Sequence, residues 1–269
     1  MRYPPTSTAL STSLSAINTH PVSDVLLGAS LVRSSAGRTP RPAAVILDLF
    51  GTLVGAPTTV ERSAAANQFA EVLGVSSAIA DSALSSSWRA RHDGQLRSTA
   101  EVAAHLVARC NAPASRVDEL ERLLTQLAHD RLQADATLLH ALQGLRHSGV
   151  MLAVLSDASP DVAEAWSRSE LAPYFDAAVF SCRVGAVKPA PQLFTAVLGA
   201  LGIAPHKALY CGDGGGDELA GAERAGIRAV RVERRGGPHG MAFGETSWPG
   251  RAIPEVEVLP SLLSTWRDR

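Results

Sequence analysis

The stretch AAVILDLFGTLV, residues 43–54, contains the pattern that decides the fold. Its first five residues, 43–47, are all apolar, and the run ends at a carboxylate, Asp48. A short apolar run of this kind is typical of a strand that is buried on both faces of a parallel sheet. A carboxylate at the end of such a strand is unfavourable unless it is paired, hydrogen-bonded or bound to a metal. Asp48 is therefore the first candidate for a functional residue.

Four further apolar runs follow along the chain. The pattern predicts strands at residues 150–155, 177–180, 208–211 and 227–232. Helix-like segments lie between them, at residues 138–147, 161–169, 191–201 and 218–225. Ser159 followed by Pro160 favours a helix start, because serine caps a helix and proline fits its first position. Strands that alternate with helices predict an α/β domain with a Rossmann-like, doubly wound parallel sheet.

Residues 58–134 interrupt this alternation. They contain amphipathic helical patterns and no strand pattern. The predicted helices cover residues 60–73, 78–91, 99–109 and 116–132. Because this block is too long for a simple crossover between two strands, we expect an inserted all-helical cap over an α/β core of residues 43–57 and 135–269. Near the end of the core, we expect a loop at 234–248 and a short helix at 259–266.

Residues 1–42 differ in composition from the rest of the chain. Serine, threonine and proline are frequent, and Asp24 is the one acid among the first 41 residues. No sustained helical or alternating pattern is present, so we expect a disordered or dispensable tail. A serine-rich, acid-poor beginning is also compatible with an organelle transit peptide, which stays as an alternative.

Composition narrows the class of protein. The 269 residues include 25 Lys and Arg against 26 Asp and Glu. This balance argues against a dedicated nucleic-acid binder or a polybasic membrane-surface protein, and no apolar run approaches the roughly 18–20 residues that span a bilayer. Three widely spaced cysteines fit neither a disulfide framework nor a zinc site. We expect a cytoplasmic monomer or homodimer that acts on a small molecule.

Three of the five predicted strands end in a polar residue that is suited to chemistry. These residues are Asp48, Ser156 and Asp213. Ligands of open α/β sheets bind beyond the carboxyl ends of the strands, so these side chains are expected at one edge of the sheet. The glycines at 214–216 do not form a GxGxxG fingerprint and come late in the chain, so we do not expect a dinucleotide site.

Four segments, in order, resemble the motifs of the haloacid dehalogenase (HAD) superfamily. They read AAVILDLFGTLV at 43–54, VLSDAS at 154–159, VGAVKPAPQLF at 184–194 and YCGDGGGDELAGAERAGI at 210–227. One such motif is a weak signal, but four in the right order and spacing are specific. The resemblance covers residues 43–232, and the helical insert lies where a C1-type cap of this superfamily is found. It implies a hydrolase.

The resemblance also implies a role for each matching residue. Asp48 is the nucleophile that forms a covalent aspartyl intermediate. Lys188 places a positive charge beside it, and Ser156 donates a hydrogen bond to a phosphate oxygen. Mg²⁺ is the implied cofactor, and its implied ligands are Asp48, the backbone carbonyl of Phe50, Asp213 and Asp217. The implied reaction is Mg²⁺-dependent hydrolysis of a small phosphorylated metabolite through an aspartyl-phosphate.

Phe50 departs from the pattern of the superfamily's phosphatases, which usually carry a second Asp at this position. Its ring cannot transfer a proton, and loss of a general acid–base typically lowers a rate on the order of 10²–10⁴-fold. In one interpretation the chain is still a phosphohydrolase. Either another group replaces the acid, with Asp157, Glu218, His92 and Asp93 as candidates, or the substrate has a good leaving group. In a second, the chain is a carbon–halide hydrolase similar to the 2-haloacid dehalogenases, because halide leaves without a proton. In a third, it is a catalytically weak HAD domain that is used for binding.

The predicted cap contains a cluster of cationic side chains. Residues 88–93 read Trp-Arg-Ala-Arg-His-Asp, and Arg97 follows. Arginine can bind an anionic group through a forked pair of hydrogen bonds. Arg91 and Arg97 are therefore candidate binding residues for a phosphorylated or otherwise anionic substrate. The alternative is a solvated helix face with ordinary Arg–Asp pairs.

Overall fold

Six parallel strands form a single sheet in this computed structural model, which describes residues 41–233 and 248–265. Their order is β3-β2-β1-β4-β5-β6, so the chain winds outwards from β1 to both sides. The strands are β1 Ala44–Leu47, β2 Met151–Ser156, β3 Ala177–Phe180, β4 Ala208–Gly212, β5 Arg228–Val232 and β6 Ala252–Ile253. The doubly wound α/β fold is confirmed, and all five expected strands are found within one residue of the expected ends. The two-residue strand β6 was not expected.

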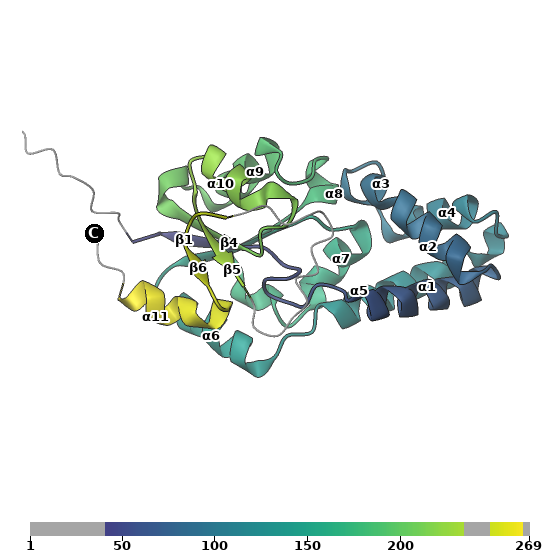
Figure 1. Cartoon of the computed structure of the whole chain (residues 1–269), viewed down its shortest axis with the longest axis horizontal. Helices are drawn as coiled ribbons and strands as arrows, with labels where there is room; N and C mark the ends of the chain where they lie inside the picture. Colours follow the sequence, from purple (N-terminus) through teal and green to yellow (C-terminus); the bar gives the residue numbers. More distant parts are fainter. Residues whose placement is uncertain (1–40, 234–247, 266–269) are drawn as a thin grey trace, which may run out of the picture. The chain divides into compact units, whose positions relative to one another are not determined.

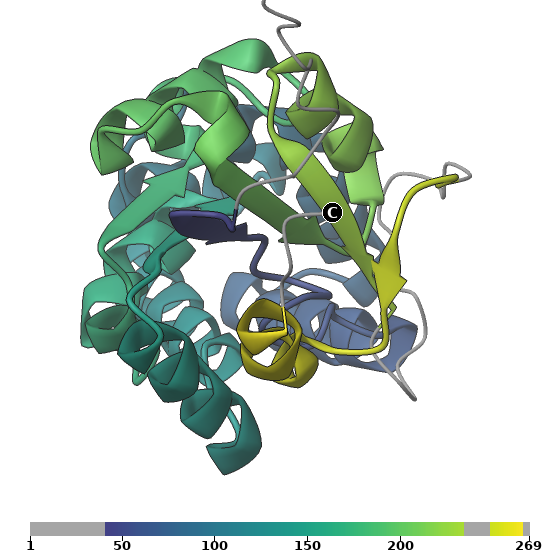
Figure 2. The ribbon, with the colours of Figure 1, turned by 90° about the vertical axis from the view of Figure 1, so that its left-hand side faces the viewer.

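Helices cover both faces of this sheet, as Figure 2 shows. One face packs against α6 Ala136–His147 and α11 Leu259–Ser264, and the other against α9 Pro191–Leu201 and α10 Glu218–Arg224. Two short helices follow β2 and β3, namely α7 Pro160–Ala165 and α8 Ser181–Val184. The helix expected at 161–169 continues beyond α7 as a 3-10 turn, Trp166–Arg168.

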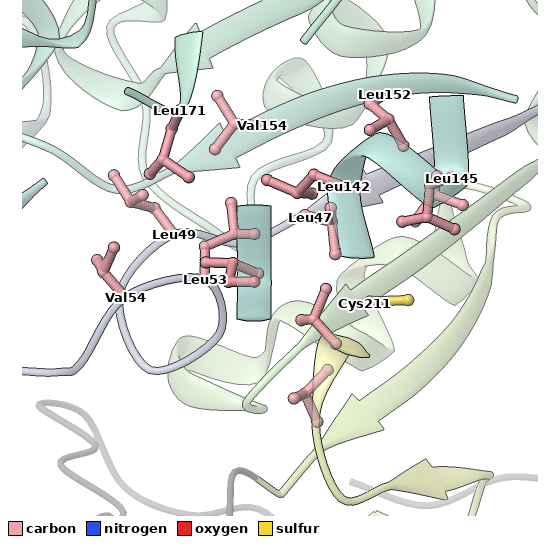
Figure 3. Packing of buried hydrophobic residues seen from close by; sticks show 14 of the residues in the cluster. Leu47, Leu49, Leu53, Val54, Leu142, Leu145, Leu152, Val154, Leu171 and Cys211 are labelled. Atoms are coloured by element: carbon pink, nitrogen blue, oxygen red, sulfur yellow. The ribbon is translucent and has the colours of Figure 1, made fainter. Parts of the chain in front are cut away.

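The alternation of side chains along β1 explains the two layers. Val45 and Leu47 contact one hydrophobic cluster, whereas Ala44 and Ile46 contact the other. All four are completely buried, because a central parallel strand has no solvent-facing side. Figure 3 shows the first cluster, in which Leu47 lies close to side chains of α6 such as Leu142. β1 thereby fixes the position at which Asp48 leaves the sheet.

Five helices form the insert between β1 and β2 (Figure 1). They are α1 Thr59–Leu73, α2 Ser77–Ser86, α3 Trp88–His92, α4 Thr99–Arg109 and α5 Val117–Arg131. The first begins with a capping box, in which the Thr58 side chain accepts from the Glu61 N–H and the Glu61 side chain accepts from the Thr58 N–H. Buried side chains between residues 65 and 124 form a hydrophobic cluster of their own. The insert therefore packs largely within itself.

The helix expected at 78–91 is broken at Ser87, between α2 and α3. The Ser87 hydroxyl donates to the Leu84 carbonyl at 3.2 Å and accepts from Arg91 Nε at 3.2 Å. Local bonds of this kind compete with the regular helical pattern. The insert also contacts the core, because the Thr99 hydroxyl of α4 donates to the Glu164 carboxylate of α7 at 2.6 Å.

Some expectations concern residues outside the described ranges. They are the tail at 1–42, apart from its last two residues, and the loop at 234–248, apart from Trp248. The expected helix at 259–266 is found as α11, which ends at Ser264. Within the described ranges, no helix is both long and apolar enough to span a membrane.

Candidate functional site

The carboxyl ends of β1, β2 and β4 meet at one edge of the sheet, because these strands are parallel neighbours. Asp48 follows β1, Ser156 ends β2 and Asp213 follows β4. All three line a cavity of about 330 Å³, whose wall also includes Lys188 and residues of the helical insert. The structure therefore brings together four of the candidate site residues.

Lys188 bridges two buried carboxylates within this site. Its Nζ lies 2.5 Å from Asp48 Oδ1 and 2.5 Å from Glu218 Oε2. The Tyr210 hydroxyl donates to the same Glu218 Oε2 at 2.7 Å, and the Gly214 N–H donates to Glu218 Oε1 at 3.0 Å. Glu218 is thus held from both sides, and it holds the Lys188 ammonium against Asp48.

The cluster contains more negative than positive charge. Asp48, Asp213 and Glu218 each place one carboxylate oxygen within 4.8 Å of the others. Burial raises the pKa of Asp48 well above its usual range, Lys188 opposes this rise, and Glu218 and Asp213 add to it. Burial also raises the pKa of Asp213, and Glu218 adds to that rise. Three clustered acids around one ammonium favour the binding of a further cation.

The pKa of Lys188 reflects a balance between burial and charge. Burial alone lowers this pKa, but the carboxylates of Asp48 and Glu218 outweigh burial and hold it well above its usual range. The ammonium therefore stays protonated beside Asp48. It is positioned to balance negative charge on a group that reacts there.

Two glycines allow the backbone to approach these acids. Gly51 has a φ of 87°, in the left-handed region, and a Cβ there would collide with the Asp213 carboxylate. A Cβ at Gly212 would collide with the Glu218 carboxylate. The turn at Gly51 also places Thr52, whose hydroxyl donates to Asp48 Oδ2 at 3.1 Å. A larger residue at either glycine would displace an acid.

The structure does not bring Asp217 into the carboxylate cluster, although the sequence analysis expected it as a metal ligand. The Asp217 side chain is 41% exposed, and its Oδ2 accepts from Arg224 at 3.0 Å. With a φ of 57°, Asp217 turns the chain immediately before α10, and the next residue, Glu218, carries the acid that meets Lys188. The position of Asp217 therefore favours a surface ion pair over a metal ligand.

Arg97, a candidate substrate-binding residue, also lies away from the cavity. It is exposed and does not contribute to the cavity wall. Its backbone N–H donates to the Glu101 carboxylate at 2.7 Å, and its carbonyl accepts from Arg183 at 2.9 Å. These bonds fix it where the insert meets the core.

Tyr210 was not expected in the site, and Glu218 was expected there only as a proton donor. In the sequence, Tyr210 is one residue of an apolar strand, and its ring packs edge-on against Phe194 with centroids 5.8 Å apart. The helical spacing of residues 218, 221 and 222 could have indicated that Glu218 is buried, because Glu218 lies on the same face of α10 as Gly221 and Ala222.

The insert contributes an aromatic and cationic part of the cavity wall. Arg91 and His92 of α3 line the cavity together with Trp88, and Phe50 lines it beside Asp48. The rings of Trp88 and His92 stack at 4.5 Å, and His92 Nδ1 donates to the Trp88 carbonyl at 2.7 Å. Burial, with the Arg91 charge adding to it, lowers the pKa of His92 to about 3. His92 is therefore neutral near pH 7.

His92 is expected to make the protein less stable as the pH falls below about 6.5, its usual pKa in an unfolded chain. Between this value and a folded pKa of about 3, the unfolded chain binds a proton that the folded chain does not. The free energy of unfolding therefore decreases with falling pH, by at most about 1.4 kcal/mol per pH unit. Urea unfolding at about pH 7 and about pH 5 measures this slope, and His92→Gln should reduce it. His140→Gln, a change at an exposed histidine of α6, is the matched control and should keep the wild-type slope. Equal slopes in all three proteins would contradict the prediction.

Comparison with known proteins identifies a family for residues 42–226, which include the site. The family model of the haloacid dehalogenase-like hydrolases matches residues 42–226. The phosphoserine phosphatase of Thermus thermophilus is 39% identical over 103 residues, which are 38% of this chain and 40% of that protein. The chain thus matches less than half the length of that curated relative.

Solved structures show the same fold. The 2-haloacid dehalogenase from Pseudomonas syringae pv. Tomato DC3000 superposes with a TM-score of 0.62 at 24% identity, covering 84% of this chain and 99% of that one. A HAD phosphatase from Thermococcus onnurineus superposes with a TM-score of 0.59 at 21% identity, covering 82% and 97%. At these identities the likeness concerns the fold alone. Because the family model covers more than half of its residues, the chain belongs to the haloacid dehalogenase-like hydrolases.

Proposed function

We propose that the chain is a Mg²⁺-dependent phosphohydrolase that acts on a small phosphorylated metabolite through an aspartyl-phosphate on Asp48. The carboxylate cluster of Asp48, Asp213 and Glu218 carries this proposal, with its oxygens within 4.8 Å of one another. Phosphoryl transfer depends on neutralising the charge of the transferred group, whereas halide release from carbon does not. Similarity to a relative named as a phosphoserine phosphatase also supports phosphate-ester hydrolysis.

The donor set fits Mg²⁺, which prefers oxygen ligands and keeps several waters. Asp48, Asp213 and the backbone carbonyl of Phe50 would hold the ion. Between described residues, no hydrogen bond occupies the Phe50 carbonyl. We assign Glu218 to positioning the Lys188 ammonium, with which it forms a buried ion pair. When bound, the ion supplies charge neutralisation at the transferred phosphoryl group.

Asp48 performs the covalent step. One of its carboxylate oxygens forms a bond to phosphorus while the ester P–O bond breaks, and the leaving oxygen takes up a proton. Lys188 Nζ, 2.5 Å from Asp48 Oδ1, balances the negative charge around the phosphoryl group. Water then attacks phosphorus, the bond to Asp48 breaks, and inorganic phosphate leaves with the carboxylate restored.

The proton for the leaving group requires a residue other than Phe50. His92 is neutral, with a pKa of about 3, both oxygens of Glu218 are engaged as acceptors, and Asp93 does not line the cavity. Asp157 does line it, and burial raises the pKa of its carboxyl. A carboxyl that holds its proton more strongly than usual suits a general acid, so we assign the transfer to Asp157.

The helical insert supports a division into cap and core. We assign residues 58–134 to a cap and residues 43–57 and 135–269 to the core. The separate hydrophobic cluster of the insert and the cavity lined from both sides support this division. A cap in this position would exclude bulk water from the aspartyl-phosphate.

Phe50→Asp is expected to raise phosphate release from alkyl phosphates by up to about 10²-fold, because it places a second general acid, besides Asp157, two residues after Asp48. The gain should be smaller on an activated aryl phosphate, whose leaving group needs little protonation. Steady-state phosphate release on both substrates measures the difference. Phe50→Asn, which is polar but cannot transfer a proton in this way, is the matched control. An equal gain in both variants would show that proton transfer does not limit the reaction.

Ser156→Ala is expected to lower kcat/KM for phosphate esters by about 10–100-fold, the loss of one hydrogen bond to a charged group. Its hydroxyl is buried without a hydrogen-bond partner among the described residues, so the free energy of unfolding should stay unchanged or rise slightly. Ser181→Ala is the matched control for stability. The Ser181 hydroxyl donates to the Ala158 carbonyl at 3.3 Å and accepts from its N–H at 3.1 Å, and its loss should lower stability by about 1 kcal/mol. Urea unfolding and steady-state kinetics together separate the two cases, and a large loss of stability in Ser156→Ala would contradict the assignment.

The deciding experiment measures phosphate release from an activated aryl phosphate, with Mg²⁺ and with a chelator. We expect release that depends on Mg²⁺. No release from folded protein would contradict the proposal.

One observation favours a second candidate function, carbon–halide hydrolysis. Phe50 lines the cavity where an acid would otherwise stand, and halide needs no proton to leave. Halide release from a 2-haloacid, measured in parallel, tests this candidate. If neither product forms, the chain is a binding domain with the HAD fold.

A further inference from the structure

Five charged side chains that the proposed reaction does not use line the same cavity, namely Arg62, Asp81, Arg91, Arg131 and Asp161. Arg91 belongs to α3, Arg131 ends α5 and Asp161 lies in the first turn of α7. With Arg62 of α1 and Asp81 of α2, the insert contributes three cations and one anion, and the core contributes one anion. None of the five forms an ion pair with a residue in the ranges that the structure describes.

Asp161 is buried but only partly satisfied. It is 6% exposed, and its Oδ1 has no hydrogen-bond partner in the described part of the chain. Burial raises the pKa of this carboxyl group, and the Ser159 side chain opposes the rise. A buried acceptor without a donor is unfavourable. Asp161 Oδ1 therefore calls for a donor that a ligand would bring into the cavity.

Arg91 and Arg131 are close enough to repel each other. Burial lowers the pKa of Arg91, the Arg131 charge lowers it further, and Asp161 opposes both. Arg91 is held in place, because its Nη2 donates to the Leu84 carbonyl at 2.8 Å. The Arg131 side chain is exposed and makes no hydrogen bond with the residues described. Two like charges at one cavity favour an anion between them.

We propose that Arg91, Arg131 and Asp161 select the substrate, and that its leaving group carries a carboxylate for the two arginines and a hydrogen-bond donor for Asp161. This inference rests on the proposed phosphohydrolase function. The substrate class is then a phosphate monoester of a short hydroxy- or amino-carboxylic acid. Guanidinium groups bind a planar carboxylate through paired hydrogen bonds.

Charge and size narrow this class. The three arginines and two aspartates leave a single positive charge, which matches one carboxylate, whereas a second phosphate dianion would be repelled by the buried Asp161. The cavity of about 330 Å³ must also hold the transferred phosphoryl group. This volume is at the lower end for ligand sites, so the carbon chain between phosphate and carboxylate must be short.

A matched series of substrates tests the inference. 3-Phosphoglycerate and O-phosphoserine carry both groups, with a hydroxyl or an ammonium as the donor. Phosphoglycolate has the carboxylate alone, whereas glycerol 3-phosphate and phosphoethanolamine have a donor alone. We expect kcat/KM for the first pair to exceed that for the donor-only pair by about 10²-fold. The ratio within the first pair identifies the donor.

Two variants assign the preference to the named residues. Arg131→Gln should lower kcat/KM for 3-phosphoglycerate or O-phosphoserine about 10-fold more than for an activated aryl phosphate without a carboxylate. It is a cleaner probe than a change at Arg91, which also supports the insert. Arg122→Gln, on the same helix but outside the cavity wall, is the control and should leave both rates unchanged. Asp161→Asn should reduce the advantage of the first pair over phosphoglycolate.

The outcomes separate this inference from the proposed function. Hydrolysis of the aryl phosphate with no preference for carboxylated esters would overturn the inference and leave the phosphohydrolase assignment standing. Equal losses on all substrates in Arg131→Gln would also overturn it. If no phosphate is released at all, the proposed function fails. Calorimetric titration with 3-phosphoglycerate then tests the site directly, and binding that Arg131→Gln does not weaken would refute it.

Discussion

Asp48→Asn is expected to lower phosphate release by at least about 10⁴-fold while the chain stays folded. An amide in place of the carboxylate cannot form the aspartyl-phosphate, so the covalent route is closed. The fold should persist because Lys188 keeps its ion pair with Glu218. The substitution also removes a buried carboxylate on which Glu218 and Asp213 act unfavourably. Steady-state phosphate release and thermal unfolding, measured on the same preparation, check both parts.

Asp130→Asn is the matched control for this experiment. Asp130 is an exposed residue of α5 whose carboxylate accepts from Gln126 at 2.8 Å, and it does not line the cavity. Its substitution should leave the rate at the wild-type value. Turnover retained by Asp48→Asn would remove Asp48 from the role of nucleophile.

Lys188→Met is expected to remove turnover and also to lower the free energy of unfolding by about 3–5 kcal/mol. Lys188 is the bonded cation of two carboxylates, Asp48 and Glu218, each at 2.5 Å. All three side chains are at most 6% exposed, so water cannot replace the lost ammonium. Methionine fills a similar volume, which separates the effect of charge from that of a cavity. Urea unfolding measures the change.

The double variant Lys188→Met with Glu218→Gln tests the cause of this loss. An amide at position 218 can still accept from the Gly214 N–H through its oxygen, and its NH2 group can donate to the Tyr210 hydroxyl oxygen. It also removes one of the two unpaired charges. We expect it to recover a substantial part of the lost stability without restoring turnover. If the double variant is no more stable than Lys188→Met, unpaired charge is not the source of the loss.

The fold was predictable because buried parallel strands leave a strong local pattern. In β1, every side chain from Ala44 to Leu47 is buried by helices on both faces, so all must be apolar, and the run is visible in the sequence. Asp48 ends this run, and its place at the sheet edge follows from the direction of the strand. The same reasoning located Ser156 and Asp213.

The details that escaped prediction depend on local geometry and on distant partners. The break at Ser87 arises from hydroxyl bonds to Leu84 and Arg91, which compete with a helical pattern that continues through it. Strand β6 has two residues, too few for a period to be recognised. Glu218 lies in the cluster in place of the expected Asp217, because the backbone turns at Asp217. The spacing of residues in the sequence does not indicate that turn.

The positions of the Arg131 and Asp161 side chains could not be predicted from the sequence for a different reason. They are 30 residues apart in sequence and come from the insert and the core. Only packing of the two brings both to one cavity. No motif contains this pair, so no motif could have indicated it.

Tyr210 connects two parts of the protein that are usually considered separately. Its hydroxyl orients Glu218 in the site, while its ring packs against Phe194 of α9 in the layer behind the sheet. A small shift of α9 would tilt the Tyr210 ring and move the Glu218 carboxylate. The distance from the Lys188 ammonium to Asp48 would then change. We therefore expect random mutagenesis selected for faster turnover to yield substitutions in α9, at positions that no substrate touches. Such substitutions would show that the rate depends on the packing of a helix outside the site.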